Sequence, residues 1–345
     1  MLRFVVNWII QFGILEFFVL MLIFVNVLTF ALYVADKKRA KKGAWRISEK
    51  TLLFFTVIFG GIGAILAMQL TKHKTRRKKF KVAAAVGLIF SLILSLHIGH
   101  SLVFRNTIRF VEMEFRSANW DMGMDGYRIA FMVDFHIMAN DSMRAIISEL
   151  NDKNIDLLLL GGDFSVRNDH YRETLAEIAQ AITTDGIFGV EGNHDDYIRL
   201  FSAKIQNGIV PLDNSGVRIR ENFFLAGVAD MWNRSPSIEQ AVANANVDDF
   251  VLLISHNPDV SMLQDTTGID LILSGHTHGG QITFFGFPFY LWRGSITNYG
   301  TRFAYGFAPS RDGTPVFTSS GIGIYYQIPR IFTRSEVVIF TMYHE

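Results

Sequence analysis

Three long apolar stretches occupy the first 105 residues of this 345-residue chain. They run from Trp8 to Val34, from Thr51 to Leu70 and from Val82 to Phe104. Each is close to the ~20 residues that an α-helix needs to cross a bilayer. A cleaved signal peptide has one shorter apolar run, so three runs argue against that interpretation. The front of the chain is therefore expected to be an all-α transmembrane unit.

Charge separates this front from the rest of the chain. Residues 1–105 hold 16 Lys+Arg and 3 Asp+Glu, a formal charge of +13, whereas residues 106–345 hold 17 and 29, a charge of −12. A basic apolar segment followed by an acidic one predicts a transmembrane unit at 1–105 and a globular domain at 106–345. Cysteine is absent from the sequence. Disulfides, thiolate metal ligands and a cysteine nucleophile are thereby excluded.

Two basic connections, at 35–50 and 72–81, separate the three apolar stretches. The positive-inside rule places both in the cytoplasm, but three full crossings would put them on opposite sides. In one solution Thr51–Leu70, which contains three glycines, enters the membrane and returns without crossing. The chain would then be a multi-pass cell-membrane protein with an extracytoplasmic rear domain. The alternative is three crossings of undetermined orientation. The basic connections are expected to meet anionic membrane lipids.

From Tyr127 onward, short apolar runs alternate with amphipathic segments. The continuous apolar run at 157–160 is typical of a strand that is buried on both faces. The alternation predicts an α/β domain. Helices are predicted at 140–153, 171–182 and 237–246, and strands at 127–134, 156–163, 186–195, 248–257 and 268–278.

Each of these five predicted strands ends in a small polar cluster. In α/β sheets, functional sites collect outside the carboxyl ends of the strands. Five such ends lying side by side would bring the polar side chains into one pocket. The clusters are Asp134-Phe135-His136, Gly162-Asp163, Gly192-Asn193-His194-Asp195, Ser255-His256-Asn257 and Gly275-His276-Thr277-His278.

These side chains have the chemistry of metal ligands. Imidazole nitrogen together with carboxylate and amide oxygen, without sulfur, suits Mn²⁺, Fe or Zn²⁺. Seven candidate ligands are too many for one tetrahedral ion and fit two ions that share a carboxylate. His276 and His278 alternate along an extended segment and can serve different ions. The neighbouring Gly275, Gly279 and Gly280 are expected to leave space for the substrate.

The ordered set D-x-H, GD, GNHD, H and GHxH resembles the calcineurin-like metallophosphoesterase superfamily over about residues 125–342. Gly-Gly-Gln after the last motif and the closing segment from Gly321 to Met342 resemble its membrane-associated branch. The resemblance implies an α/β/β/α sandwich and a phosphoesterase or phosphodiesterase with two divalent metal ions, manganese first and iron or zinc as alternatives. Phe135 and Val166 depart from the family's usual Leu and Asp, but neither departure removes a ligand.

Carried over position by position, the resemblance also assigns roles. His194 would contact the phosphoryl oxygen or protonate the leaving group, and Asp195 would orient His194. The two ions would lower the pKa of a bridging water, and the resulting hydroxide would attack phosphorus in line. Asp163 would bridge the ions. The implied ligands are Asp134, His136, Asp163 and His278 for the first ion, and Asp163, Asn193, His256 and His276 for the second.

The front of the chain resembles a small bacterial membrane-protein family of unknown function over about residues 20–80. The shared positions include Asn26, Trp45-Arg46, Gly60-Gly61 and His73-Lys74-Thr75. This resemblance implies a membrane location and says nothing about chemistry.

Three functions are consistent with these patterns. The first is a membrane-anchored dinuclear phosphohydrolase that cleaves a phosphodiester or pyrophosphate bond in a phosphorylated small molecule, lipid or envelope substrate. The aromatic run from Phe284 to Trp292 would guide a lipid-linked phosphate to the ions. The second is an inactive membrane adaptor that keeps the phosphoesterase fold, and the third is a transporter with a regulatory rear domain. Nucleic acid is not an expected partner, because the Lys and Arg residues of the rear domain are scattered.

Overall fold

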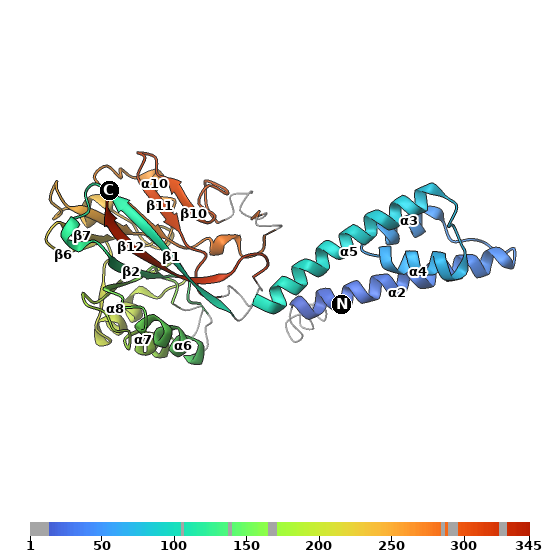
Figure 1. Cartoon of the computed structure of the whole chain (residues 1–345), viewed down its shortest axis with the longest axis horizontal. Helices are drawn as coiled ribbons and strands as arrows, with labels where there is room; N and C mark the ends of the chain where they lie inside the picture. Colours follow the sequence, from blue (N-terminus) through green and yellow to red (C-terminus); the bar gives the residue numbers. More distant parts are fainter. Residues whose placement is uncertain are drawn as a thin grey trace. The chain divides into compact units, whose positions relative to one another are not determined.

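The computed structural model describes residues 14–104, 107–136, 140–164, 171–283, 287–288, 296–323 and 330–345. The chain folds as two compact units, Met1–Val103 and Phe104–Glu345. Figure 1 colours both units along the sequence. Each unit is described by itself.

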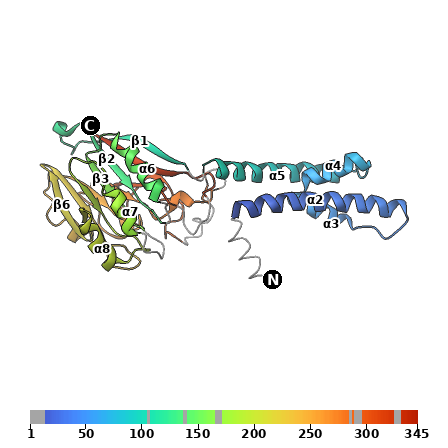
Figure 2. The ribbon, with the colours of Figure 1, turned by 90° about the horizontal axis from the view of Figure 1, so that it is seen from below.

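Two long helices dominate the first unit. Helix α2 (Ile14–Lys41) and helix α5 (Lys78–Phe104) are both long and apolar enough to cross a membrane. Two short helices, α3 (Glu49–Val57) and α4 (Gly61–Thr71), connect them (Figure 2). The apolar stretch from Thr51 to Leu70 is therefore two helices and not one. The expectation of one continuous helix across this stretch is wrong, and the choice between a full crossing and a return stays a prediction.

The break between α3 and α4 depends on a contact with α2. The Asn26 side chain donates from Nδ2 to the carbonyl oxygen of Phe59 (2.8 Å) and accepts from the backbone N–H of Gly63 (2.9 Å). A Cβ atom at Gly63 would lie 2.0 Å from the carbonyl oxygen of Asn26, so only glycine permits this approach. Backbone groups freed at the break thus find partners inside the protein, as an apolar environment requires.

Two six-stranded sheets form the centre of the second unit. Strand β12 lies between β1 and β2, parallel to the first and antiparallel to the second (Figure 1). In order, the first sheet contains β1 (Ile108–Ser117), β12 (Ser335–His344), β2 (Tyr127–Met132), β3 (Leu157–Leu160), β4 (Ile187–Gly189) and β5 (Ile209–Pro211). The second contains β10 (Gly306–Pro309), β11 (Pro315–Thr318), β9 (Leu271–Ser274), β8 (Phe250–Ile254), β7 (Phe223–Gly227) and β6 (Ser215–Arg220).

Helices cover the outer face of each sheet. Apolar side chains of both sheets, among them Phe131 and Leu252, form one core between them. Each sheet also forms one further core with its own helices. The predicted α/β/β/α sandwich is therefore confirmed. The predicted helix at 237–246 is shorter than expected. The helices are α6 (Asn140–Asn151), α7 (Tyr171–Ile178) and α8 (Tyr197–Gln206) on the first sheet, and α9 (Ile238–Ala241) and α10 (Val260–Leu263) on the second.

The five strand ends with polar clusters are divided between the two sheets. Strands β2, β3 and β4 are neighbours in the first sheet and run parallel. Strands β8 and β9 are parallel neighbours in the second sheet. The five ends therefore belong to two sheets and not to one. Their carboxyl ends meet from two stacked sheets, which places the site at one edge of the sandwich.

Candidate metal centre

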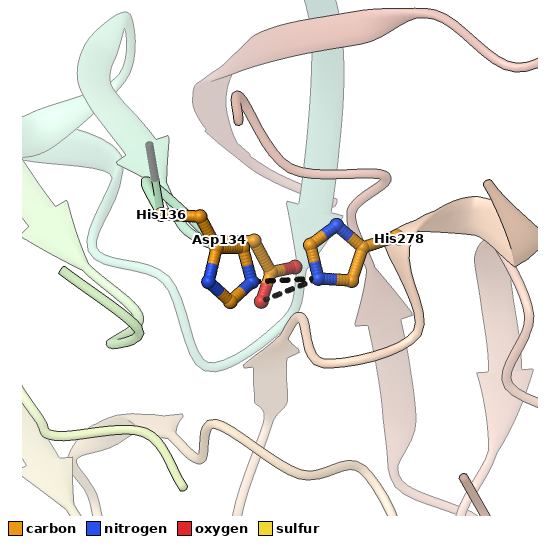
Figure 3. Close-up of side chains that lie close together, drawn as sticks. All are labelled: Asp134, His136 and His278. Carbon is orange, nitrogen blue, oxygen red and sulfur yellow. Dashed lines mark hydrogen bonds and ion pairs between the residues drawn. The ribbon is translucent and has the colours of Figure 1, made fainter. Parts of the chain in front are cut away.

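Asp134, His136 and His278 form the first group of candidate ligands. Asp134 and His136 follow β2, and His278 begins the short 3₁₀ helix η2 (His278–Gly280) that follows β9. The Nε2 atoms of His136 and His278 lie 2.9 Å apart, and His278 Nε2 lies 3.8 Å from Asp134 Oδ1. Figure 3 shows the three side chains pointing toward one another. One ligand atom from each lies within 4.8 Å of the others, a spacing that suits a single ion.

A second group surrounds the Nε2 atom of His256. Asn193 Oδ1 lies 3.1 Å from this nitrogen, His276 Nδ1 lies 3.2 Å from it, and Asp163 Oδ2 lies 3.3 Å from it. The Nδ1 atom of His256 is 2.8 Å from the carbonyl oxygen of Gly161, which fixes the ring orientation. Four donor atoms from β3, β4, β8 and β9 ends therefore converge on one point.

Asp163 lies against both groups. Its Oδ2 atom is 3.3 Å from His256 Nε2 and 3.5 Å from His136 Nε2. The structure thus brings all seven predicted ligands together in one cluster. Asp134 also comes within 4.8 Å of Asp163 and His256. The division into two ion shells with Asp163 as the bridge stays a prediction.

Most of the candidate ligands hold an unusual backbone conformation. Residues other than glycine rarely adopt positive φ, and such residues cluster at functional sites because the surrounding structure must hold them there. Here the backbone N–H of Asp134 donates to Gly162 O (3.0 Å), and that of His136 donates to Asp163 O (2.9 Å). The residues concerned are Asp134 (57°), His136 (42°), Asp163 (59°), His276 (69°) and His278 (53°).

Burial keeps three of the four imidazoles neutral. Loss of solvation lowers the pKa of His136 to about 4 and that of His276 to about 3, and it holds the pKa of His278 well below its ordinary value. A neutral imidazole has a free lone pair on one ring nitrogen, which is the form that binds metal. His136, His276 and His278 are therefore in the protonation state that ligation requires at neutral pH.

Asp163 and His256 each shift the pKa of the other toward its charged form. Burial favours the neutral form of Asp163, but the imidazoles around it, His256 first, outweigh burial and keep its pKa below the usual range. Burial likewise opposes a charge on His256, but Asp163 raises the pKa of that ring to about 10. For Asp134, burial dominates and raises the pKa. Asp163 and His256 thus form a buried charge pair, since buried charges need an opposite charge or metal coordination.

The donor set fits divalent metal ions. It offers two carboxylates, one amide oxygen and four imidazoles, and six of the seven side chains are buried. Mixed nitrogen and oxygen donors of this kind bind Mn²⁺, Fe or Zn²⁺. The residues that would hold such ions are the seven predicted from the strand ends.

His194 and Asp195 lie beside this cluster. The His194 ring is partly exposed, and its centroid is 5.5 Å from that of His136. Its backbone N–H donates to Asp163 Oδ1 (2.9 Å). The Asp195 carboxylate accepts backbone N–H groups of Asp163 (2.7 Å), Phe164 (2.8 Å) and Gly192 (2.8 Å). Asp195 therefore joins the loops after β3 and β4, and its predicted role in orienting His194 stays a prediction.

Three residues at the end of β7 were missed by the sequence analysis. Asp230 Oδ2 accepts the backbone N–H groups of Trp232 (2.9 Å) and Asn233 (2.8 Å). Trp232 then meets the His276 ring edge-on at 4.7 Å, and Asn233 Nδ2 donates to the carbonyl oxygen of Asn193 (2.5 Å). The apolar run of β7 followed by Asp230 was a sixth strand end that sequence reasoning could have found.

Two buried cations, Arg330 and Lys204, contact the segments next to the ligands. Arg330 donates from Nη1 to His278 O (3.1 Å) and from Nη2 to Gly323 O (2.6 Å). Lys204 on α8 donates from Nζ to Glu191 Oε1 (2.8 Å). Glu191 comes directly before the loop that carries Asn193. Neither cation was predicted, because a lone Arg or Lys gives no motif in the sequence.

The glycines next to the ligands contact protein. A Cβ at Gly275 would lie 2.9 Å from Asp134 Oδ2, one at Gly279 would lie 2.8 Å from Ser320 Cβ, and one at Gly280 would lie 2.2 Å from Pro288 Cβ. The expectation that these glycines leave space for substrate is therefore wrong, because neighbouring loops fill that space. Val166 and most of the aromatic run, including Trp292, lie outside the described residues.

Both units match known protein families. Residues 127–280, which contain all seven candidate ligands, match the family described as calcineurin-like phosphoesterase. The second unit is a calcineurin-like phosphoesterase domain. Residues 26–80 of the first unit match a family described as protein of unknown function.

Relatives of the phosphoesterase domain occur in bacteria and vertebrates. An uncharacterized metallophosphoesterase of Helicobacter pylori is 30% identical over 232 residues, which cover 61% of this chain and 58% of the relative. One of Campylobacter jejuni is 24% identical over 310 residues, covering 84% and 78%. A transmembrane protein with metallophosphoesterase domain from Danio rerio is 26% identical over 316 residues, covering 83% and 69%. The chain thus spans less than two thirds of the Helicobacter relative.

Proposed function

We propose that the chain is a membrane-anchored phosphohydrolase that uses two divalent metal ions to cleave a phosphodiester or pyrophosphate bond. The observation that carries this proposal is the position of Asp163, whose Oδ2 atom lies within 3.5 Å of imidazoles from both ligand groups. A relative from Escherichia coli, 30% identical over 173 residues, is named a phosphodiesterase, which supports the diester class. A phosphorylated lipid or envelope component is the proposed substrate, and nucleic acid is not an expected one.

The chain's own residues would hold the ions, give a proton to the leaving group and keep the ligand loops together. Bound divalent ions would neutralise phosphate charge and supply an activated water at neutral pH. Asp134 and Asp163 would hold them, with manganese as the proposed metal. The partly exposed His194 ring lies next to the His136 ring, where it can hydrogen-bond a phosphoryl oxygen and give a proton to the leaving oxygen. Asp195 keeps the loops of His194 and Asp163 together through its three backbone N–H partners.

Metal removal tests the proposal. Full-length protein in detergent, stripped with a chelator, is expected to lose hydrolysis of bis(p-nitrophenyl) phosphate and to regain it when Mn²⁺ is added. Fe²⁺ and Zn²⁺ are compared at the same concentration, and bound metal is counted by elemental analysis. Folded protein that binds two ions but turns over no diester would be tested on pyrophosphates and monoesters. Folded protein that binds no metal would support the inactive adaptor instead.

We also propose that α2 and α5 cross the membrane and that the phosphoesterase domain is extracytoplasmic. The basic segments 35–50 and 72–81 adjoin the end of α2 and the start of α5, so both would lie on the cytoplasmic side. The far end of α5 leads into the second unit, which therefore follows on the opposite side. The relatives that are named transmembrane proteins support a membrane location.

Single cysteines test this orientation, because the sequence has none. Asp248→Cys places a thiol on an exposed position of the phosphoesterase domain, and Lys42→Cys places one in the first basic segment. In intact cells, a membrane-impermeant maleimide is expected to label Asp248→Cys and not Lys42→Cys, while both react after lysis. Labelling of Lys42→Cys alone in intact cells would reverse the proposed orientation.

A further inference from the structure

A basic pocket lies in the first unit, apart from the metal centre. It has a volume of about 490 Å³ and is lined by Arg46 and the segment Lys72–Arg77. This lining contains five Lys and Arg residues and one His, and among the described residues no acid belongs to it. A pocket with this lining attracts an anion, and its arginines can bind phosphate oxygens in pairs.

Two acidic side chains hold the lining in place. Asp36 is fully buried and accepts from Arg46 Nε (3.1 Å) and Nη2 (2.5 Å), while its Oδ2 atom also lies 2.7 Å from His73 Nε2. Glu49 accepts from Lys74 Nζ (2.6 Å) and Arg77 Nη1 (2.5 Å). The five Lys and Arg residues of the lining outnumber these two acids. The pocket is therefore preorganised and keeps an excess of positive charge.

An apolar groove begins beside this pocket. It has a volume of about 560 Å³ and lies between α3 and α5, with Lys78 and Lys79 at one end. Its apolar lining consists of Leu53, Val57, Val82, Ala83 and Val86. Lys79 pairs with Glu49, the same carboxylate that holds Lys74 and Arg77 of the basic pocket. Glu49 thus links one lining residue of the groove to two lining residues of the basic pocket.

The position of both features matches the level of lipid headgroups. The first candidate span ends at Lys41 and the second begins at Lys78, and a contact between the Tyr33 and Phe80 rings (6.0 Å) joins the two spans. Trp45, next to Arg46, is 92% exposed. Exposed tryptophan and basic side chains at the end of a span are typical of the membrane interface.

We propose that the first unit binds one anionic phospholipid, with its phosphate group in the basic pocket and an acyl chain in the apolar groove. A free phosphate would satisfy the pocket and would leave the groove unused, so the adjoining groove favours the lipid. The site is separate from the metal centre and does not depend on its activity. It gives the otherwise unassigned first unit a binding function.

Paired variants of the full-length protein in detergent test this site. Lys72→Gln with Arg76→Gln removes two exposed pocket cations, and Lys38→Gln with Lys42→Gln removes two exposed cations outside the pocket. Phosphatidylglycerol retention is measured by native mass spectrometry, with phosphatidylcholine as the neutral comparison. The pocket variant is expected to weaken phosphatidylglycerol binding about 30-fold, because it loses two cations that attract the headgroup. The control variant is expected to weaken binding less than about threefold.

A second pair tests the groove, using the same measurement. Val86→Trp fills it, whereas Ala85→Trp adds the same side chain at an exposed position outside its lining. Val86→Trp is expected to reduce lipid retention and Ala85→Trp to leave it unchanged. If each test variant and its control lost lipid retention equally, the lipid would be held by diffuse charge attraction. That result would overturn the proposal. Displacement by excess inorganic phosphate, with no effect of Val86→Trp, would assign the pocket to free phosphate and also overturn it.

Discussion

Asp163→Asn is expected to reduce turnover of bis(p-nitrophenyl) phosphate by at least ~10³-fold, because two-metal charge stabilisation contributes several kcal/mol to the transition state. The substitution keeps the size and shape of the side chain. An amide oxygen can still accept the backbone N–H of His194, which donates to Asp163 Oδ1 in the native chain. What the change removes is the negative charge that lies against both ligand groups.

The measurement combines kinetics with metal content. Purified Asp163→Asn protein is expected to lose at least one of two bound metal ions, counted by elemental analysis, while its far-ultraviolet circular dichroism stays native. Asp248→Asn, at an exposed position outside the set of candidate ligands, is the matched control and should keep full activity. An Asp163→Asn protein with native turnover and two bound ions would disprove the bridging role of this carboxylate.

Lys204→Met is expected to destabilise the phosphoesterase domain by about 3–5 kcal/mol, because removing one partner of a buried ion pair leaves the other charge uncompensated. Lys204 is fully buried, and its Nζ atom lies 2.8 Å from Glu191 Oε1 and 4.9 Å from the Phe164 ring centroid. Without the ammonium group, Glu191 would face the buried Asp213, whose pKa is already raised by burial and by Glu191.

Thermal unfolding followed by tryptophan fluorescence measures the loss, since Trp120 is buried in the core between the sheets. For a domain of this size, the expected decrease in Tm is roughly 6–20 °C. Lys153→Met is the control, because its pair with Glu112 is partly exposed and should contribute less than about 1 kcal/mol. Adding Glu191→Gln to Lys204→Met should recover part of the loss. Equal effects of Lys204→Met and Lys153→Met would contradict the prediction.

The strands that carry the ligands were predictable because each is a short apolar run with a polar end. Strands β2, β3, β4, β8 and β9 all fall within predicted segments. Their division into two sheets was not visible in those runs, because sheet order depends on pairing between distant segments. Strand β1, for example, is placed by ten register pairs with β12. The two-sheet sandwich was predicted only from the family resemblance.

The residues that bind were easier to predict than the residues that support them. Asp163 and His256 stand in short motifs with glycine or serine beside them, and chemistry alone selects them as ligands. Lys204 and Arg330 act through contacts with Glu191 and with loop carbonyls, which only the folded chain brings together. The same holds for the break before Gly60, which depends on Asn26 from another helix. Periodicity within one segment carries no information about such contacts.

The position of β12 has a consequence for the synthesis of the protein. Residues 335–344 fill the place between β1 and β2, so the first sheet stays open until they have left the ribosome. Strand β12 pairs with β2 directly before the loop that carries Asp134. The first unit is translated much earlier and can enter the membrane while the phosphoesterase domain is still an unfolded chain. If the domain crosses the membrane as proposed above, it would cross as a chain whose first sheet is not yet complete.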